Sequence, residues 1–506
     1  MKWLRRTLIG LGVVVVLGGA ALWAWLPPVD IPLKGTLANR FPKLFAMPTA
    51  DAATVKSRLV VPAGYGITLF ARDVPDARMV RVTPAGDLVV ASPGKGRVWW
   101  FSKALNADGQ SAERRVLLDG LDGPNGLDFH DGYLYVAEQD KVGRVKFDDA
   151  GRVDGRYAIV IDGLPSGGNH WKKTIRFGPD GLLYLNIGSS CNVCLEKDKR
   201  RAAMLRFTPD GKFVDVYATG LRNAAGLDWN GAGTLYATDN GRDLLGDDFP
   251  PCELNEIRQG GFYGWPFANG DRVPDPDLGA GREAVIAASI PPAFAFRPHN
   301  APLGIVFLKS DAQPADYRGD ALVALHGSWN RSKKDGYKVV ALHWSADGSI
   351  QSRDFVTGFL VDENVIGRPA EVTEDGAGTI YVSDDYANAI YRIVPGGTQA
   401  LEIGKAEPVH ATDAAAADPK LVARGATAFG QRGCQQCHAL EGDGKDGRVV
   451  LANLKGRYDT STLIDYLAKP RQPMPPVDDA DARQALAAFL LDRPPLRTAN
   501  PQQTAS

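Results

Sequence analysis

Apolar positions between about residues 65 and 395 follow one repeated pattern: an apolar segment, a short turn with Asp and Gly, and further apolar segments. Six such units begin near residues 66, 116, 158, 216, 294 and 355. One unit cannot bury both of its faces alone, and regular repeats of this kind are typical of a β-propeller. The pattern therefore predicts an all-β six-bladed propeller over residues 63–395. Insertions around 185–205 and 240–290 are expected as long loops on one face, where functional residues usually gather.

A helical pattern follows the propeller. Residues 396–417 are rich in Ala, Gly and Asp without a clear period, which indicates a linker. Asp418 and Pro419 are a favourable N-cap and first-turn pair for a helix. A last helix is expected over about residues 479–491, with its large apolar side chains on one face. The pattern predicts a small all-α domain and then a disordered tail, over residues 418–493 and 494–506.

An uninterrupted apolar segment from Leu8 to Leu26 follows a basic N-terminus. Roughly 20 apolar residues are enough to cross a bilayer as a helix, and basic residues before them favour an inside N-terminus. We therefore expect residues 1–28 to be a membrane anchor, followed by an extended lead-in over 29–62. A cleaved signal peptide is the alternative, although no A-x-A-like cleavage site follows. An anchor would place the rest of the chain on the periplasmic side of a bacterial inner membrane.

The sequence C-x-x-C-H at Cys434, Cys437 and His438 is the attachment signature of haem c. Two thiols at this spacing can add to the haem vinyl groups, and the following imidazole then ligates the iron. Met474, which lies between prolines, is the expected second axial ligand. The alternatives are a disulfide or a zinc site, and zinc would need two further Cys or His ligands that the nearby sequence lacks. This region resembles class I bacterial cytochromes c, in which the first and last helices cross beside the haem.

Three groups of loop residues place polar side chains next to Gly and Pro, around residues 164–170, 220–255 and 326–331 with 367–369. A loop histidine such as His170 can act as a general base near neutral pH. Several Arg and Asn side chains around one centre suit an anionic ligand with several carboxylates. Carbonyls beside Gly, with Asp and Glu nearby, suit Ca²⁺. Each feature also has a plainer explanation, because a lone His is more often part of the scaffold and an Asp-Asp segment is more often a turn.

At these residues the chain resembles the quinoprotein family of soluble glucose and sorbosone dehydrogenases, six-bladed propellers that bind pyrroloquinoline quinone (PQQ) and Ca²⁺. The resemblance covers about residues 60–395. It is carried by Gly-Asn-His at 168–170, Gly-Leu-Arg-Asn at 220–223, Asp-Asn-Gly-Arg-Asp at 239–243, Glu-Leu-Asn at 253–255 and Phe-Tyr-Gly-Trp-Pro at 262–266. These motifs are closer to the sorbosone branch of the family than to the glucose branch.

The resemblance implies roles for individual residues. His170 would take the proton of the substrate hydroxyl as hydride passes to the quinone C5, and Arg222 would stabilise charge on the reduced quinone. The further PQQ ligands expected are Asn223, His326, Arg331 and Arg368. The Ca²⁺ ligands expected are the carbonyls of Gly241 and Arg242, with Asp247, Asp248 and Glu253 as additional candidates.

The chain also departs from the family pattern. Asn169 precedes the histidine where the glucose branch has Asp, Ala225 replaces a cofactor-binding Gln, and Pro124 stands at another polar contact. His326 falls where a Lys is expected, and Ala370 where a second Arg is expected. The fold and PQQ are still expected, whereas no particular sugar follows from the sequence.

Three further cysteines lie in the propeller region. Cys191 and Cys194 form a C-x-x-C without a following His, so a second haem is not expected. In an exported protein a local disulfide is the favoured interpretation. Cys252 is then either buried and unreactive, or paired with one of these two in place of the local bridge.

The sequence therefore predicts a periplasmic quinoprotein–cytochrome dehydrogenase. It would oxidise a sugar, a sorbosone-like aldehyde or an alcohol with PQQ, and pass electrons to haem c and a respiratory acceptor. Two alternatives stay open: a Ca²⁺-dependent lactonase-like hydrolase, and a non-enzymatic propeller that docks the cytochrome to a partner. The 58 basic and 59 acidic residues nearly cancel, which argues against nucleic acid as a partner.

Overall fold

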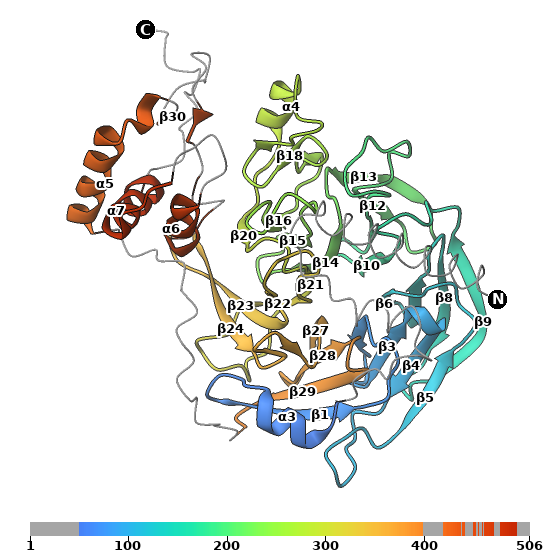
Figure 1. Cartoon of the computed structure of the whole chain (residues 1–506). Coiled ribbons are helices and arrows are strands. Elements are labelled where there is room, and N and C mark those ends of the chain that lie inside the picture. The colour runs from blue at the N-terminus through green and yellow to red at the C-terminus, as the bar shows by residue number, and fades with distance from the viewer. Residues whose placement is uncertain are drawn as a thin grey trace, which may run out of the picture.

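The computed structural model describes residues 50–397 and, in the C-terminal region, residues 418–436, 438–440, 449–451, 454, 458, 460–469 and 476–492 (Figure 1). The predicted anchor at 1–28, together with Cys437 and Met474, lies outside these residues. The helices that the structure describes include none with the length and apolar character needed to cross a membrane.

Six sheets are arranged as the blades of a propeller (Figure 1). Each has four antiparallel strands, and the sheet of blade 3 gains a short fifth strand, β17 (Gly261–Phe262), which pairs in parallel with β13 (Phe213–Thr219). Blade 1 contains β2 (Val80–Val82), β3 (Leu88–Ser92), β4 (Arg97–Phe101) and β5 (Arg114–Leu118). Blade 2 contains β6 (Gly126–His130), β7 (Tyr133–Ala137), β8 (Val142–Phe147) and β9 (Val153–Ile161). Blade 3 contains β10 (Lys173–Phe177), β11 (Leu183–Ile187), β12 (Ala203–Phe207) and β13 (Phe213–Thr219). Blade 4 contains β14 (Ala224–Trp229), β15 (Leu235–Asp239), β16 (Cys252–Glu256) and β20 (Phe294–Phe296). Blade 5 contains β21 (Pro302–Phe307), β22 (Ala321–Leu325), β23 (Lys338–Trp344) and β24 (Ile350–Val356). Blade 6 contains β27 (Pro369–Glu374), β28 (Ile380–Asp384), β29 (Ala389–Pro395) and β1 (Tyr65–Ala71). Short elements in the connections are α3 (Ala52–Arg58), η1 (Pro93–Lys95), β17 (Gly261–Phe262), β18 (Ala268–Asn269), β19 (Val273–Pro274), α4 (Glu283–Ala288), β25 (Leu360–Val361) and β26 (Asn364–Val365). The predicted six-bladed propeller is confirmed.

The first strand of the propeller closes its last blade. β1 pairs with β29 in an antiparallel register, with Tyr65 opposite Pro395 and Ile67 opposite Ile393. The six unit starts expected from the sequence therefore fall on outer strands, namely β1, β5, β9, β13, β20 and β24. The number of blades is right, and the phase of the repeat is shifted by one strand. The period of a repeat is the same whichever strand is counted first, so the sequence pattern does not fix the phase.

Residues 50–62 differ from the extended lead-in that was expected. The helix α3 begins after Asp51, whose carboxylate accepts a hydrogen bond from the Thr54 backbone N–H at 2.8 Å and so acts as an N-cap. Val55 belongs to the apolar cluster that contains Val356 of blade 5 and Val372 of blade 6. This segment is therefore part of the folded body.

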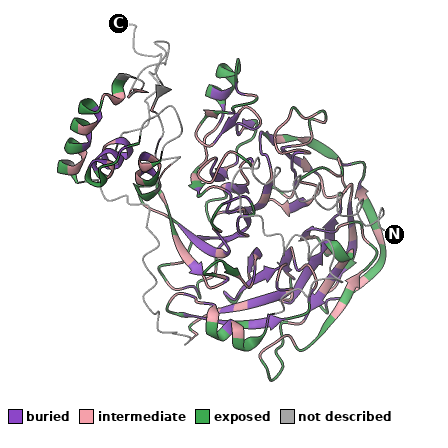
Figure 2. Cartoon of the chain, viewed as in Figure 1, coloured by how far each residue is buried: buried purple, intermediate pink, exposed green. Residues whose placement is uncertain are grey.

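The apolar core is divided between neighbouring blades. One cluster joins Tyr135 and Val142 of blade 2 to Ile175 and Leu185 of blade 3. Inner strands are buried and outer strands are more exposed (Figure 2): β11 is buried throughout, whereas most of β9 reaches solvent. An inner strand such as β11 is thus held by packing on both of its faces, which gives the loops at its ends a rigid base.

Paired charges lie on the innermost strands. Arg81 Nη1 lies 3.4 Å from Glu371 Oε1, and Arg176 Nη2 lies 3.1 Å from Asp228 Oδ1. Arg81, Glu371 and Asp228 are almost completely buried. Because an unpaired buried charge costs several kcal/mol, the two members of each pair depend on one another. The first pair joins blade 1 to blade 6, and the second joins blade 3 to blade 4.

The C-terminal domain is helical. It contains α5 (Pro419–Gln431), η2 (Cys434–Gln436), β30 (His438–Ala439), β31 (Val449–Val450), α6 (Thr460–Ala468) and α7 (Ala480–Leu491). Asp418 and Asp479 cap α5 and α7 by accepting hydrogen bonds at 3.0 Å from backbone N–H groups of the first turn. The expected first and last helices are confirmed, and they pack together through Phe429 and Phe489, whose ring centroids are 5.8 Å apart.

Gly425 allows α5 and α7 to approach closely. A Cβ at this position would lie 2.0 Å from the Ala485 carbonyl oxygen and 2.5 Å from Phe489 Cβ. We expect Gly425→Ala to separate the helices and destabilise the domain by about 1–3 kcal/mol, measured as faster hydrogen exchange of the α7 amides. Gly430→Ala is the matched control, because its Cβ would meet nothing within 4 Å. Equal protection of α7 in both variants would contradict the prediction.

Candidate functional site

A cavity of about 160 Å³ lies where the innermost strands of the blades begin. All six blades line it, through Arg78 and Met79 before β2, Asn125 before β6, Asn169 to Lys172 and Thr174 at β10, Asn223 and Ala225 at β14, Leu303 and Gly304 at β21, and Ala370 and Glu371 at β27. Because each blade contributes at the same end of its innermost strand, the cavity lies on the axis of the ring. Of the expected site residues, His170 and Asn223 line it.

His170 has one ring nitrogen fixed and one free. Its Nδ1 lies 2.8 Å from Ser189 Oγ and 3.1 Å from the Ser189 carbonyl oxygen. The Ser189 hydroxyl donates its only proton to the Cys191 carbonyl at 2.7 Å, so both Ser189 oxygens accept and Nδ1 must carry the imidazole proton. Nε2 is therefore the unprotonated nitrogen, and the described residues give it no hydrogen-bond partner.

Burial and the positive charge of Arg222 lower the pKa of His170 to about 3. The imidazole is therefore neutral over the whole range in which an ordinary histidine titrates. A neutral imidazole with an accessible lone pair is the form that accepts a proton. The geometry and the charge state of His170 both suit a general base.

Arg222 is buried and held by two loops. Its Nε and Nη2 donate to the carbonyl oxygen and to the side-chain oxygen of Asn192, both at 2.9 Å. Nη1 donates to the Asn240 carbonyl at 3.1 Å, and Nη2 also donates to Asp243 at 2.9 Å. Its charge acts on His170, but its side chain lines a second cavity.

This second cavity, of about 20 Å³, is lined by Arg222, Gly241, Arg242 and Glu253 among the expected site residues. Asp239 also lines it and is the cross-strand partner of Glu253. Burial raises the pKa of Asp239 to about 7, and burial together with the charge of Asp239 raises that of Glu253 to about 8. Two adjacent buried carboxyl groups that resist ionisation would be stabilised by a hard cation such as Ca²⁺.

The two other acidic candidates, Asp247 and Asp248, contact a different loop, the one that carries Arg331. Asp247 accepts a hydrogen bond from the Ser332 backbone N–H at 2.9 Å, and its carbonyl accepts from Arg331. Asp248 Oδ1 lies 3.7 Å from Arg331 Nη2. These contacts join residues 247–248 to the loop that carries Arg331. Among the described residues, Asp247 and Asp248 do not form a three-residue metal-binding group with Glu253.

His326 and Arg368 lie behind the wall of the axial cavity. Arg368 donates to the carbonyls of His326 and Gly327 at 3.0 and 2.9 Å. His326 Nε2 lies 2.8 Å from Asp385 Oδ1 and 3.3 Å from Arg78 Nη1. Neither of these two expected PQQ ligands lines the cavity. His326 instead contacts Arg78, which does line it.

Two cations that the sequence analysis did not single out line the axial cavity. Arg78 donates from Nη1 to Asp385 at 2.5 Å. The Lys172 ammonium lies 4.5 Å from the centroid of the Trp171 ring, and burial with the charge of Arg78 lowers the pKa of Lys172 to about 8. Arg78 lies two residues before β2 and Lys172 immediately before β10. Both residues therefore lie at the start of a blade. If the repeat in the sequence had been divided at the innermost strands, this position would have indicated them as cavity residues.

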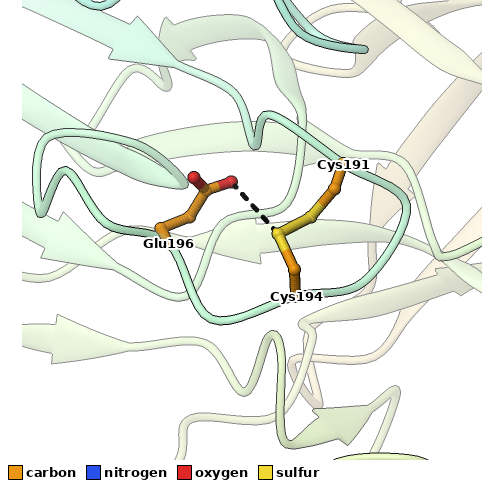
Figure 3. Close-up of side chains that lie close together, drawn as sticks. All are labelled: Cys191, Cys194 and Glu196. Atoms are coloured by element: carbon orange, nitrogen blue, oxygen red, sulfur yellow. Dashed lines mark hydrogen bonds between the residues drawn. A yellow bond between two sulfur atoms is a disulfide. The ribbon is translucent and has the colours of Figure 1, made fainter.

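Cys191 and Cys194 form the predicted disulfide (Figure 3). Cys194 Sγ lies 4.0 Å from Glu196 Oε1. In the described part of the chain, these residues form the one group of three or more His, Cys, Asp or Glu side chains whose ligand atoms are close enough for a metal ion. The disulfide occupies both sulfurs, so the group does not offer thiolate ligands. Cys252 is buried, and burial raises the pKa of its thiol to about 11, which confirms the buried, unreactive alternative.

The haem-attachment sequence follows α5 directly. Cys434 lies in η2 and packs against the apolar cluster that contains Phe429 and Leu486. Nδ1 of His438 is buried and has no hydrogen-bond partner within the described residues. A thiol and an imidazole at the edge of an apolar cluster fit the attachment of a large, flat apolar group such as haem.

Comparison with known proteins finds the same two parts. A family model described as Glucose / Sorbosone dehydrogenase matches residues 133–392, and one described as Cytochrome c matches residues 422–493. An uncharacterized protein of Borreliella burgdorferi is 29% identical over 365 residues, which cover 68% of this chain and 93% of that protein. The pyrroloquinoline quinone-dependent pyranose dehydrogenase of Coprinopsis cinerea is 25% identical over 60% of this chain, and the match spans 48% of that enzyme.

Solved structures share the propeller. The holo form of the PQQ domain of the Coprinopsis cinerea pyranose dehydrogenase matches with a TM-score of 0.58 and 21% identity, over 69% of this chain and 98% of the domain. The calcium structure of a Trichoderma reesei carbohydrate-active enzyme of family AA12 matches with a TM-score of 0.58 and 19% identity, over 67% of this chain and 97% of that one. At such identities the likeness shows a common fold.

Proposed function

Because the chain belongs to the glucose/sorbosone dehydrogenase family, we propose that it oxidises a sugar, or a related alcohol or aldehyde, with PQQ and passes the electrons to haem c in its own C-terminal domain. The observation that carries the proposal is the axial cavity, in which a neutral histidine with a free Nε2 shares the wall with two cations. If the protein were a lactonase-like hydrolase, the haem domain would have no role. If it were a docking module, the general base His170 would have no role.

The residues of the axial cavity fit PQQ, a planar quinone with carboxylate groups that accepts two electrons from the substrate when it is bound. Arg78 and Lys172 supply the positive charge that such an anion requires. Asn125 adds a buried Oδ1 that lacks a hydrogen-bond partner among the described residues and can accept from an N–H group. Together with Asn223, these residues would hold the cofactor.

His170 would remove the proton of the substrate hydroxyl. Its Nε2 is free to accept that proton, while Nδ1–H stays bonded to the two Ser189 oxygens. These acceptors become stronger partners once the ring is positively charged, so Ser189 stabilises the protonated imidazole as well as orienting it. A base positioned in this way contributes a factor of about 10²–10⁴ to the rate.

Ca²⁺ is proposed at the second cavity. The Glu253 carboxylate and the carbonyls of Gly241 and Arg242 would bind it, with Asp239 beside them. The support is the pair of buried carboxyl groups, whose negative charge a cation would balance. A bound cation there would also fix the loop that carries Asn240 and Asp243, both of which hold Arg222.

In the C-terminal domain, haem c would be attached through Cys434 and Cys437, with His438 and Met474 as axial ligands. Tethering the haem to the propeller gives it a high effective concentration near the electron donor without tight docking. Residues 8–26 would anchor the protein in the bacterial inner membrane, so that both domains lie on the periplasmic side near a respiratory acceptor.

The proposal is tested with the purified full chain. PQQ and Ca²⁺ are added, a panel of aldoses, alcohols and aldehydes is offered, and the haem absorption is followed. Haem reduction that requires both substrate and PQQ supports the dehydrogenase. Lactone hydrolysis with an unchanged haem spectrum supports the hydrolase instead, and a chain that does not bind PQQ is not a quinoprotein.

Lys172→Gln is expected to weaken PQQ binding by about 10- to 100-fold, because one charge-assisted contact to a carboxylate is lost. In the native chain the affinity should be constant below pH 8 and fall above it, since Lys172 must be protonated to attract an anion and its pKa lies at about 8. Titration of PQQ absorbance measures both effects. Lys199→Gln, an exposed lysine, is the control, and equal affinities of the two variants would remove Lys172 from the site.

A further inference from the structure

Asn192, which lies between the two cysteines of the disulfide, joins three loops. Its Oδ1 accepts from the Asp243 backbone N–H at 2.8 Å, and its Nδ2 donates to the Asp243 carbonyl at 3.0 Å. Its own carbonyl accepts from Trp265 Nε1 at 3.3 Å. The side-chain amide thus pairs with the backbone of Asp243 through both a donor and an acceptor, which fixes its orientation.

The same residue sets the orientation of Arg222. Two of the four hydrogen bonds that the structure gives the Arg222 guanidinium end on Asn192, one on its carbonyl and one on its Oδ1. Two parallel bonds from one planar guanidinium define its plane, whereas a single contact would leave it free to turn. Arg222 is 3% exposed, so water has little access to replace these bonds.

The loop that carries Asn192 also holds the base. Ser189, three residues earlier, accepts the Nδ1–H of His170 and donates to the Cys191 carbonyl. Ser190 is fixed in turn by Glu196, which accepts from its backbone N–H and from its hydroxyl. The segment 189–196 therefore touches both His170 and Arg222, although it contains neither.

We propose that Asn192 is a positioning residue for Arg222, and that the Cys191–Cys194 disulfide, which closes the short loop around Asn192 (Figure 3), keeps Arg222 and His170 in one working arrangement. The inference rests on the proposed function of these two residues. The physical reason is that residues 188–202 contain no helix or strand, so the backbone there lacks a ladder of hydrogen bonds. A cross-link between residues three apart removes conformations that would carry Asn192 away from Arg222.

The test compares four variants of the full chain. Cys191→Ser with Cys194→Ser removes the cross-link by substitution, because a chemical reductant would also reduce the haem. Asn192→Ala keeps the disulfide and removes the side-chain contacts, and Asn192→Asp restores an acceptor for Arg222. Leu195→Ala is the matched control, since this side chain lies in the same loop and is 58% exposed.

We expect kcat for PQQ-dependent haem reduction to fall about 10- to 100-fold in the disulfide variant and in Asn192→Ala. The dissociation constant of PQQ should change less than about threefold, Asn192→Asp should recover part of the loss, and Leu195→Ala should match the native chain. If the disulfide variant does not fold, Asn192→Ala decides the question because it retains the cross-link. Native kcat in Asn192→Ala would overturn the proposal.

A second measurement needs neither PQQ nor substrate. The charged groups that act on His170 are Arg222 and Arg201, and both oppose its protonation. If Asn192→Ala lets Arg222 move away, the pKa of His170 rises toward its ordinary value, and the imidazole becomes protonated at a higher pH than in the native chain. Titration by NMR of histidine-labelled protein, assigned with His170→Gln, shows this shift. An unchanged titration of His170 in Asn192→Ala would count against the positioning role. A native chain that shows no PQQ-dependent haem reduction would instead count against the proposed function.

Discussion

His170→Gln loses substrate-driven haem reduction by a factor of about 10²–10⁴ and still binds PQQ; this is the largest effect that we expect from a single side chain. Gln can donate its amide N–H to the Ser189 oxygens that hold Nδ1 in the native chain. It cannot accept the substrate proton at neutral pH, because an amide is not a base. The variant therefore removes the chemistry and preserves the local hydrogen bonds.

The measurement is the initial rate of haem reduction after substrate is added to the PQQ-loaded full chain. PQQ absorbance shows that the cofactor is bound, and a direct chemical reductant shows that the haem is still reducible. His343→Gln is the matched control, because His343 is an exposed histidine of blade 5 that pairs with Asp320. A turnover in His170→Gln that equals that of His343→Gln would remove His170 from the mechanism.

Replacing Cys434 and Cys437 together by Ser should abolish covalent haem attachment and stop electron transfer through the C-terminal domain. Both thioether bonds need a thiol, so no covalent link to the haem vinyl groups can form. The axial cavity is built by the propeller alone, so substrate oxidation with a soluble dye as acceptor should continue. The two halves of the reaction would thus be separated.

Covalent haem is measured by its retention on the denatured chain, and substrate oxidation by bleaching of the dye. Cys252→Ala is the control for haem content, because it removes a thiol that lies outside the attachment sequence. Covalent haem in the double variant would show that attachment uses other residues. Loss of dye reduction together with the haem would show that the propeller does not oxidise the substrate by itself.

The local signals in the sequence were sufficient for most elements. Asp418 caps its helix as expected, because an N-cap depends on the few residues that follow it. The short strands of the propeller follow from apolar segments separated by turn residues, and the repeat of this pattern indicates the number of blades. Cys191 and Cys194 form a disulfide that their spacing and an exported setting favoured. The helix α3 was missed, since its seven residues give too short a pattern to indicate a helix.

The composition of the candidate site was predicted only in part. His170 and Asn223 were identified and line the axial cavity, whereas His326 and Arg368 lie behind its wall. Arg78 and Lys172 were not singled out, because a cation beside a strand looks like any surface residue in the sequence. Their role depends on which ends of the strands meet at the axis.

By itself the sequence determined the attachment signature of the haem, the number of blades, and the residue types of a general base and an anion site. These properties depend on residues close together in the chain, whose spacing is fixed by covalent geometry. Only the tertiary structure decided that β1 closes the last blade, that Nε2 of His170 is the free nitrogen, and that Asn192 holds Arg222. Each of these depends on contacts between segments distant in the chain, and such contacts are selected by the packing of the whole ring rather than by any local pattern.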